Sequence, residues 1–315
     1  MTTSSQKPVL LVTAADLAPQ ALDMLKEFEV VFAGKQPTEE DLTALCAKHK
    51  PTAIIVRYGK VTARMMDAAE KLKVISKHGS GTDTIDKAAA SERGIAVRAA
   101  VGANAAAVSE HAWALILACA KSIPHLDQRM RAGHWDKATH KSFELDGSTL
   151  GLVGLGAIGR RVAAVGIAFG MNVIAYDPFA KQAPEGIKLA SLDEVYAAAD
   201  VLSLHCPLTE DNRNMVNAQT LARLKTGAIL VNTARGGLID EAALIDALAS
   251  GKLRSAAVDS FAVEPMAHPH PFQNVPNLIL TPHSGGVSDA AYVKMGQGAA
   301  ANVLAVIEEN ARNAA

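Results

Sequence analysis

Three polar residues in the second half of the chain have the side-chain types needed for anion binding and acid–base chemistry. Arg235 follows the apolar segment 228–232, and His283 follows the apolar segment 278–281. A guanidinium binds a carboxylate through two hydrogen bonds, and histidine exchanges a proton near neutral pH. Glu264 lies between them in sequence, and a nearby carboxylate fixes the tautomer of a histidine and raises its pKa. Taken singly, each residue also fits a surface turn or a structural role.

A glycine-rich turn earlier in the chain predicts a dinucleotide site. Gly154, Gly156 and Gly159 follow the apolar segment 148–153 and open a helical pattern, and Asp177 ends the next apolar run. This order of strand, glycine turn, helix, strand and acidic residue is the dinucleotide fingerprint. The first glycine permits a tight turn, the second lets the backbone approach a pyrophosphate, and the third lets helix and strand pack closely. The helix N-terminus favours the phosphates.

The acidic residue after the second strand favours NAD over NADP. A carboxylate accepts hydrogen bonds from a ribose 2′-OH and repels a 2′-phosphate. Asp177 precedes Pro178, so an ordinary turn residue is the alternative. Lys181 is the nearest cation and keeps NADP open. With a nicotinamide cofactor, the anion anchor and proton carrier described above are what hydride transfer on a 2-hydroxy acid requires.

Composition narrows the class of protein. A chain of 315 residues suits two domains. A net charge of −1 and 4% aromatic residues argue against a nucleic-acid or membrane surface. Three scattered cysteines indicate a reducing compartment without a disulfide framework. No metal-ligand spacing, secretion segment or membrane-length apolar run is present, so a cytoplasmic protein without a metal is expected.

Alternating strand and helix patterns predict two doubly wound parallel sheets. The first hundred residues contain no glycine fingerprint, and a second series of strands runs from about 148 to 281. The last helix, from about 288, follows that series. We therefore expect a Rossmann nucleotide domain, 102–283, inserted into a flavodoxin-like substrate domain, 1–101 and 284–315. The substrate is expected to meet the cofactor between them.

Several motifs in register resemble the D-isomer-specific 2-hydroxyacid dehydrogenases, including phosphoglycerate dehydrogenases and hydroxypyruvate reductases. The matching strings are 151–161, 204–209, 232–237, Asp259 with Glu264-Pro265, and 281–283. The resemblance implies that Arg235 binds the substrate carboxylate and keto oxygen. It further implies that His283 is the acid/base and that Glu264 pairs with it.

The resemblance also implies two sets of ligand contacts. The cofactor contacts would be Gly154, Gly156, Ala157, Ile158, Gly159, Asp177, His205, Cys206, Pro207, Thr209, Thr233, Ala234, Asp259 and Gly285. Among these, Asp259 matches the residue that contacts the nicotinamide carboxamide. The substrate contacts would be Arg57, Gly79, Ser80, Gly81, Asn104, Arg235 and His283.

The substrate and the oligomeric state stay open. Arg57 and Lys60 fit contacts to a distal anion or an exposed basic strand end, and His78 fits a substrate contact or a solvated strand end. The sequence leaves four substrate classes open: phosphoglycerate, glycerate/hydroxypyruvate, glyoxylate and lactate-type acids. The Ala-rich helix 104–121 and the Trp135 region resemble the family's dimerisation arm, which predicts a homodimer; an ordinary buried helix is the alternative. The competing classes are a non-catalytic NAD(H)-sensing protein on this scaffold and a different Rossmann enzyme.

Overall fold

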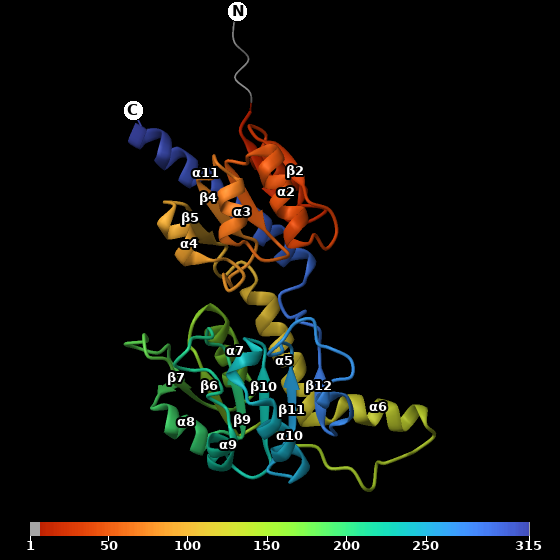
Figure 1. The fold of residues 1–315 in the computed structure, drawn as a ribbon. Helices are drawn as coiled ribbons and strands as arrows, with labels where there is room; N and C mark the ends of the chain where they lie inside the picture. The colour runs from red at the N-terminus through yellow and green to blue at the C-terminus, as the bar shows by residue number, and fades with distance from the viewer. Residues whose placement is uncertain (1–6, 315) are drawn as a thin grey trace, which may run out of the picture. The chain divides into compact units, whose positions relative to one another are not determined.

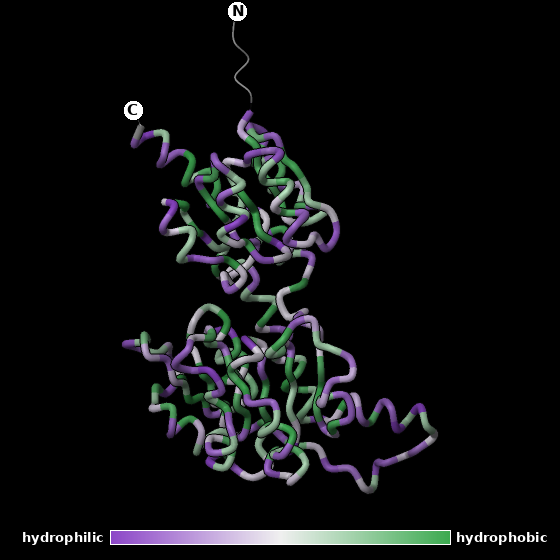
Figure 2. Tube along the Cα trace, viewed as in Figure 1, coloured by the Kyte–Doolittle hydropathy of each residue, from purple (hydrophilic) through white to green (hydrophobic). Residues whose placement is uncertain are grey.

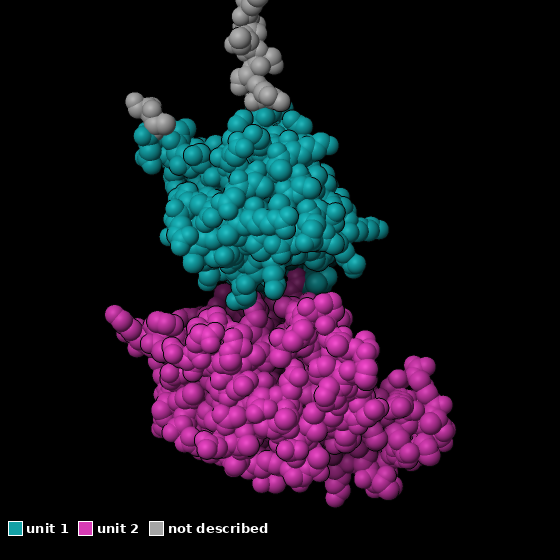
Figure 3. All heavy atoms as spheres, viewed as in Figure 1, with its two compact units in different colours: residues 1–104, 287–315 teal, residues 105–286 magenta. Residues whose placement is uncertain are grey.

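The computed structural model describes residues 7–314, which form two compact α/β units. The first unit comprises the chain up to Asn104 and the segment from Val287 onward, and the second is Ala105–Gly286 (Figure 3). The second unit is therefore inserted into the first. Its ends lie three residues after the expected boundaries, at 105 rather than 102 and at 286 rather than 283.

The first unit is built on a five-stranded parallel sheet in the order β2-β1-β3-β4-β5 (Figure 1). This is the flavodoxin-like order of a doubly wound fold. The strands are β1 (Val9–Val12), β2 (Glu29–Phe32), β3 (Ala53–Val56), β4 (Val74–Lys77) and β5 (Ala96–Ala99). The helices are α1 (Pro19–Met24), α2 (Glu39–His49), α3 (Ala63–Ala68), α4 (Lys87–Glu92) and α11 (Asp289–Ala314).

Helices cover both faces of this first sheet. On one face α1 and α11 pack around Ala21 and Val303, and on the other face α2 and α3 pack around Leu42 and Met65. All four residues of β3 are buried, as expected for a parallel strand covered on both sides. The polar segment that begins at Arg57 therefore starts where the buried strand β3 ends.

The second unit contains a seven-stranded parallel sheet in the order β12-β11-β10-β9-β6-β7-β8. The strands are β6 (Thr149–Val153), β7 (Asn172–Tyr176), β8 (Ile187–Leu189), β9 (Val201–Leu204), β10 (Ala228–Asn232), β11 (Leu253–Val258) and β12 (Leu278–Leu280). The helices are α5 (Ala105–Lys121), α6 (Ile123–Arg131), α7 (Ala157–Ala168), α8 (Leu192–Ala198), α9 (Ala218–Arg223) and α10 (Glu241–Ala249), with short 3₁₀ turns η1 (Gly236–Leu238) and η2 (Pro271–Asn274). The predicted fold class, two doubly wound parallel sheets, is confirmed.

Two apolar cores lie on opposite faces of the second sheet. One includes Trp113 of α5 and Val162 of α7, and the other includes Tyr196 of α8 and Leu244 of α10. Figure 2 shows the hydrophobic strands inside each unit and more hydrophilic segments around them. Within residues 7–314, no helix combines the length and the hydropathy needed to cross a membrane.

Side-chain caps define where several helices begin. Ser191 and Glu194 form a capping box at α8, and Asp240 accepts hydrogen bonds from the first turn of α10. The short strand β8 was not expected from the sequence. It is three residues long, lies at the sheet edge and has no fully buried residue, so its apolar pattern is weak.

Candidate active site

The predicted acid–base residues follow three strands that are neighbours in the second sheet. Arg235 comes after β10, Glu264 after β11 and His283 after β12, and these strands are adjacent in the order β12-β11-β10. Because parallel strands end at one edge of a sheet, the three segments meet there. The glycine turn follows β6 and Asp177 follows β7 along the same edge. Strand order reverses between β9 and β6, which is where doubly wound sheets bind ligands.

His283 and Glu264 form a direct pair. Nδ1 of His283 lies 2.7 Å from Oε2 of Glu264, and the backbone N–H of Phe261 donates to Oε1 of Glu264 at 2.9 Å. The carboxylate is therefore held from both sides, and it orients the imidazole through Nδ1. His283 has a left-handed backbone with φ of 52°, which is uncommon for a residue other than glycine.

The contact between His283 and Glu264 raises the pKa of the histidine and lowers that of the carboxyl, so both charged forms are favoured. The hydrogen bond that His283 donates to Glu264 raises the pKa of His283 above its ordinary value, although burial and Arg235 oppose this. Burial alone would raise the pKa of Glu264, but the hydrogen bonds from His283 and Phe261 and the charges of His283 and Arg235 hold it below its ordinary value. The arrangement therefore favours an imidazolium facing a carboxylate.

Close backbone packing brings the Arg235 segment against the loop that carries Glu264. A Cβ on Gly236 would lie 1.9 Å from the carbonyl carbon of Phe261, so no side chain fits there. Asn232, at the end of β10, accepts from the Ala234 N–H at 3.0 Å and donates to the Arg235 carbonyl at 2.8 Å. These bonds fix the turn from which the guanidinium projects.

The loop around His283 is anchored by the buried carboxylate of Asp259, which is 2% exposed. Asp259 accepts hydrogen bonds from the backbone N–H groups of Ser284 and Gly285, both at 2.9 Å, and from the Thr281 hydroxyl at 2.6 Å. His111 of α5 lies 3.3 Å from the same carboxylate through Nε2. Sequence reasoning missed His111; a single histidine within the apolar pattern of α5 was the available signal.

The glycine turn has the shape that a pyrophosphate needs. Gly154 has φ of +101°, and a Cβ there would lie 2.7 Å from the carbonyl carbon and oxygen of His205. A Cβ on Gly159 would lie 2.1 Å from the Gly154 carbonyl oxygen. A Cβ on Gly156 would meet nothing within 4 Å, so the space over this residue is open. Ala157 and Ile158 begin α7, whose N-terminus faces this turn. The residues therefore fit a bound dinucleotide.

The structure brings Asp177 to the same turn. Its carboxylate accepts from the Leu155 N–H at 2.8 Å and from the Phe179 N–H at 2.9 Å. The first bond ties the end of β7 to the turn after β6. The second is turn chemistry of its own loop, which was the alternative for this residue, and a contact between Asp177 and a ribose stays a prediction.

Other predicted cofactor contacts line the same sheet edge. His205, Cys206, Pro207 and Thr209 follow β9, and Thr233 and Ala234 follow β10. Burial lowers the pKa of His205 to about 4 and raises the pKa of Cys206 to about 11, so both are uncharged at neutral pH. The buried hydroxyl of Thr233 has no hydrogen-bond partner among residues 7–314. A bound ligand would satisfy this polar atom.

The predicted substrate contacts Arg57, Gly79, Ser80, Gly81 and Asn104 all belong to the first unit. Gly79 has φ of +134° after β4, and the Ser80 hydroxyl donates to Oδ1 of Asn104 at 3.3 Å. Arg57 follows β3, the neighbouring strand. In the same unit, His78 is 8% exposed, and its Nε2 has no partner within residues 7–314. The alternative of a solvated strand-end residue is therefore wrong for His78.

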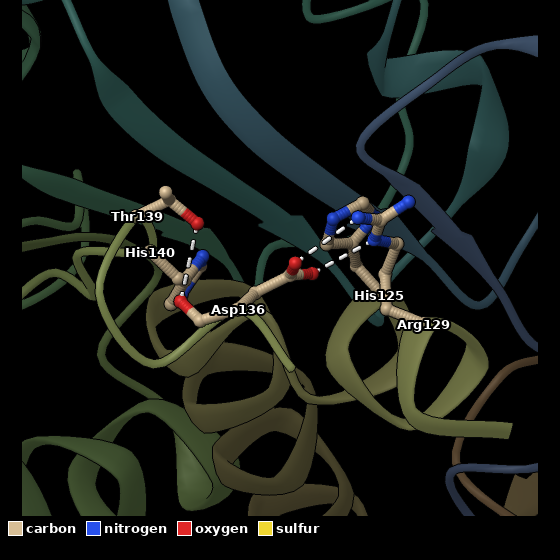
Figure 4. A pocket seen from close by; sticks show the side chains of 5 residues that line it. All are labelled: His125, Arg129, Asp136, Thr139 and His140. Atoms are coloured by element: carbon tan, nitrogen blue, oxygen red, sulfur yellow. Dashed lines mark hydrogen bonds and ion pairs between the residues drawn. The ribbon is translucent and has the colours of Figure 1, made fainter. Parts of the chain in front are cut away.

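A separate surface hollow of about 280 Å³ lies beside α6 (Figure 4). It is lined by His125, Arg129, Asp136, Thr139 and His140. Arg129 pairs with Asp136 at 2.7 Å, which joins α6 to the loop that follows it. Within residues 7–314, no three His, Cys, Asp or Glu side chains gather as metal ligands.

Comparisons with known proteins identify the class of this fold. The NAD-binding domain of D-isomer specific 2-hydroxyacid dehydrogenases matches residues 113–285, more than half of the chain. A structure of the TT0316 protein from Thermus thermophilus superposes with a TM-score of 0.86 at 36% identity, covering 96% of this chain and 97% of that one.

Two curated relatives extend the match over both units. A hydroxypyruvate reductase of Thermotoga maritima is 38% identical over 282 residues, which are 89% of this chain and 92% of the relative. A D-3-phosphoglycerate dehydrogenase of Methanocaldococcus jannaschii is 41% identical over 288 residues, 90% of this chain but only 54% of the relative. The chain thus spans about half the length of that relative.

These matches and the two parallel sheets define an NAD-binding oxidoreductase. The chain belongs to the D-isomer-specific 2-hydroxyacid dehydrogenase family, and the resemblance seen in its sequence motifs is confirmed.

Proposed function

We propose that the protein transfers a hydride between NAD(H) and C2 of a small polar or anionic D-2-hydroxy acid or 2-keto acid. The observation that carries this proposal is the His283–Glu264 pair at 2.7 Å, in the loops after β12 and β11, at the sheet edge where Arg235 follows β10. The relatives named hydroxypyruvate reductase and D-3-phosphoglycerate dehydrogenase support glycerate/hydroxypyruvate and 3-phosphoglycerate as leading substrates.

Glu264, His283 and Arg235 each have one task in the proposed reaction. Bound NADH supplies the hydride. His283 donates a proton from Nε2 to the substrate oxygen, since its Nδ1 is held by Glu264. Arg235 binds the carboxylate bidentately and polarises the carbonyl. In the oxidation direction, the neutral imidazole takes the hydroxyl proton instead.

The proposal is tested by following NADH absorbance with purified protein. The panel contains hydroxypyruvate, 3-phosphohydroxypyruvate, glyoxylate and pyruvate, and the initial rates rank them. Turnover of any of these 2-keto acids supports the dehydrogenase. Measurable NADH binding without turnover of any would contradict it and favour a nucleotide-sensing protein on the same scaffold. Glyoxylate or pyruvate as the best substrate would favour the glyoxylate or lactate-type alternative.

The pH profile should report the His283–Glu264 pair. The raised pKa of His283 keeps the imidazolium present to a higher pH than in a free histidine. Because keto-acid reduction needs this proton, kcat is expected to stay high below the pKa and to fall as the pH rises through it. Glu264→Gln removes the main cause of the raised pKa, so the falling limb should move to lower pH.

The matched control is a second Glu–His pair in the same unit. Glu241 lies 3.5 Å from Nε2 of His270, and Glu241→Gln should leave the pH profile in place. A profile of Glu264→Gln that coincides with wild type would remove Glu264 from the control of the His283 proton.

Cofactor choice is expected to depend on Asp177. Asp177→Ala should raise KM for NADH by roughly tenfold, because a charge-assisted hydrogen bond to the ribose is lost. Discrimination against NADPH should relax in the same variant, since the repulsion of a 2′-phosphate disappears. Asp193→Ala removes an equivalent charge from an exposed pair with Arg223 and serves as the control. An unchanged NADH/NADPH ratio would show that Asp177 is a turn residue only.

We also propose that the protein is a homodimer formed through the α5–α6 region. Three large apolar side chains of α6 and its following loop are exposed: Ile123 at 55%, Met130 at 52% and Trp135 at 75%. Exposed apolar groups gathered in one region indicate an interaction surface. Light scattering that reports a monomer would overturn this assignment.

A further inference from the structure

A cluster of charged and aromatic side chains lies at the carboxyl ends of the first unit's strands. Asp16 follows β1, Arg57 follows β3 and His78 follows β4, and these strands are neighbours in the sheet. Tyr292, from α11, packs against the same group. Strand ends of doubly wound sheets are where ligands bind. The cluster includes the residue expected to contact the distal part of the substrate.

Arg57 is held on several sides by this cluster. Its Nη1 donates to the backbone carbonyl of Asp16 at 2.8 Å and also forms an ion pair with Oδ1 of the Asp16 carboxylate. Its guanidinium carbon lies 4.9 Å from the centre of the Tyr292 ring and 5.4 Å from that of Tyr58. Thr13 accepts from the Arg57 backbone N–H at 3.0 Å. The Arg57 side chain is only 14% exposed.

Asp16 is the exposed member of this pair and is fixed in place. Its side chain is 68% exposed, and the Tyr292 hydroxyl donates to Oδ1 at 3.0 Å. Burial alone would raise the pKa of Asp16, but the hydrogen bonds from Arg57 and Tyr292 and the charge of Arg57 hold it below its ordinary value. The carboxylate is therefore ionised at neutral pH, and it lies beside the guanidinium that an incoming anion would need.

The other titratable side chains beside the pair are those of His78 and Lys77. Burial and the charge of Arg57 lower the pKa of His78 to about 4, so this imidazole is neutral. Lys77 donates from Nζ to the backbone carbonyl of Arg57 at 3.2 Å. A phosphate at this cluster would therefore meet an ionised carboxylate bound to the only guanidinium of the group, and like charges oppose binding.

We propose that Asp16 is a specificity-determining residue that selects 2-keto acids with an uncharged, hydroxyl-bearing distal group over phosphorylated ones. This inference rests on the proposed function and narrows its substrate to the hydroxypyruvate type. A hydroxyl can donate to the Asp16 carboxylate and accept from Arg57, whereas a phosphate can only accept at neutral pH from groups that Asp16 already occupies.

The test compares kcat/KM for hydroxypyruvate and 3-phosphohydroxypyruvate in wild type and in Asp16→Asn. Wild type should prefer hydroxypyruvate. The variant keeps the side-chain shape but loses the charge, so kcat/KM for the phosphorylated acid should rise by about tenfold relative to hydroxypyruvate. The gain should vanish when Arg57→Met is combined with Asp16→Asn, because the freed guanidinium is its source. A wild-type preference for 3-phosphohydroxypyruvate, or an unchanged ratio in Asp16→Asn, overturns the inference.

Two further variants separate this effect from a general change of charge. Asp67 pairs with Arg93 at 2.8 Å elsewhere in the same unit, and Asp67→Asn should leave the substrate ratio unchanged. An equal shift in this control would overturn the assignment to Asp16. Tyr292→Phe keeps the ring over Arg57 and removes one hydrogen bond to Asp16, so it should shift the ratio in the same direction by less.

Binding of inorganic phosphate gives a readout that does not depend on turnover. Isothermal titration calorimetry should show about tenfold tighter phosphate binding to Asp16→Asn than to wild type. If no 2-keto acid is reduced by wild type, the proposed function fails, and the phosphate titration alone decides whether Asp16 repels anions. Equal phosphate affinities in the two proteins would overturn the role of Asp16 even if the dehydrogenase activity is present.

Discussion

Replacing His283 with alanine is expected to lower kcat for 2-keto acid reduction by roughly 10²–10⁴-fold, the range for a positioned general acid. The imidazole is the group that Glu264 orients, at 2.7 Å, and its raised pKa keeps it protonated near neutral pH. KM for NADH should change much less, because the glycine turn and Asp177 follow different strands. Steady-state kinetics with the best substrate of the panel measures both parameters.

The control for this variant is His134→Ala, which removes an exposed histidine from the loop after α6. Its kcat should equal that of wild type. Thermal melts of both variants establish that the folds are intact. A His283→Ala enzyme with a rate near wild type would exclude His283 as the proton carrier.

The glycine turn offers the second large expected effect, a loss of NADH affinity in Gly156→Ala. Gly156 has φ of −75°, which alanine adopts freely, and its added Cβ would meet no protein atom within 4 Å. The variant should therefore fold with an unchanged Tm. A methyl group in the open space would meet the pyrophosphate, which needs close approach to the backbone at this second glycine. Fluorescence titration of NADH should show a Kd raised by roughly 10–100-fold.

Gly154→Ala is the contrasting variant. Its Cβ would clash with the His205 backbone at 2.7 Å and its φ is +101°, so this variant should lose stability by about 1–3 kcal/mol. The two substitutions thus separate a ligand effect from a folding effect within one turn. Normal NADH affinity in Gly156→Ala would place the cofactor away from this residue.

Much of the fold was predictable because both sheets are parallel and covered on both faces. Their strands appear as short apolar runs, as β7 (Asn172–Tyr176) and β9 (Val201–Leu204) illustrate. Local polar signals fixed helix starts equally well, as the capping box of Ser191 and Glu194 shows. The edge strand β8 was not predicted, because its residues are only partly buried and its hydrophobic pattern is weak.

The residues of the candidate site were predictable by type, but which of them contact one another in the folded protein was not. Arg235, Glu264 and His283 are separated by many residues, and only the order of β10, β11 and β12 brings their segments to one sheet edge. The partners of Asp259 were equally hidden, because His111 comes from α5, far earlier in the chain. Such contacts depend on the order of strands, which a single local pattern does not contain.

The sequence by itself determined the dinucleotide fingerprint and the identities of the polar residues after each strand, because these follow from local spacing and hydrophobic period. The family was indicated separately, by the resemblance of several motifs in register. Only the tertiary structure decided how these groups modify one another. It joined Asp16 to Arg57 across 41 positions and buried His78 beside them. Charge neutralisation and burial depend on distances in space, so the same arginine that suggested an anion site in the sequence carries its counter-ion in the folded protein.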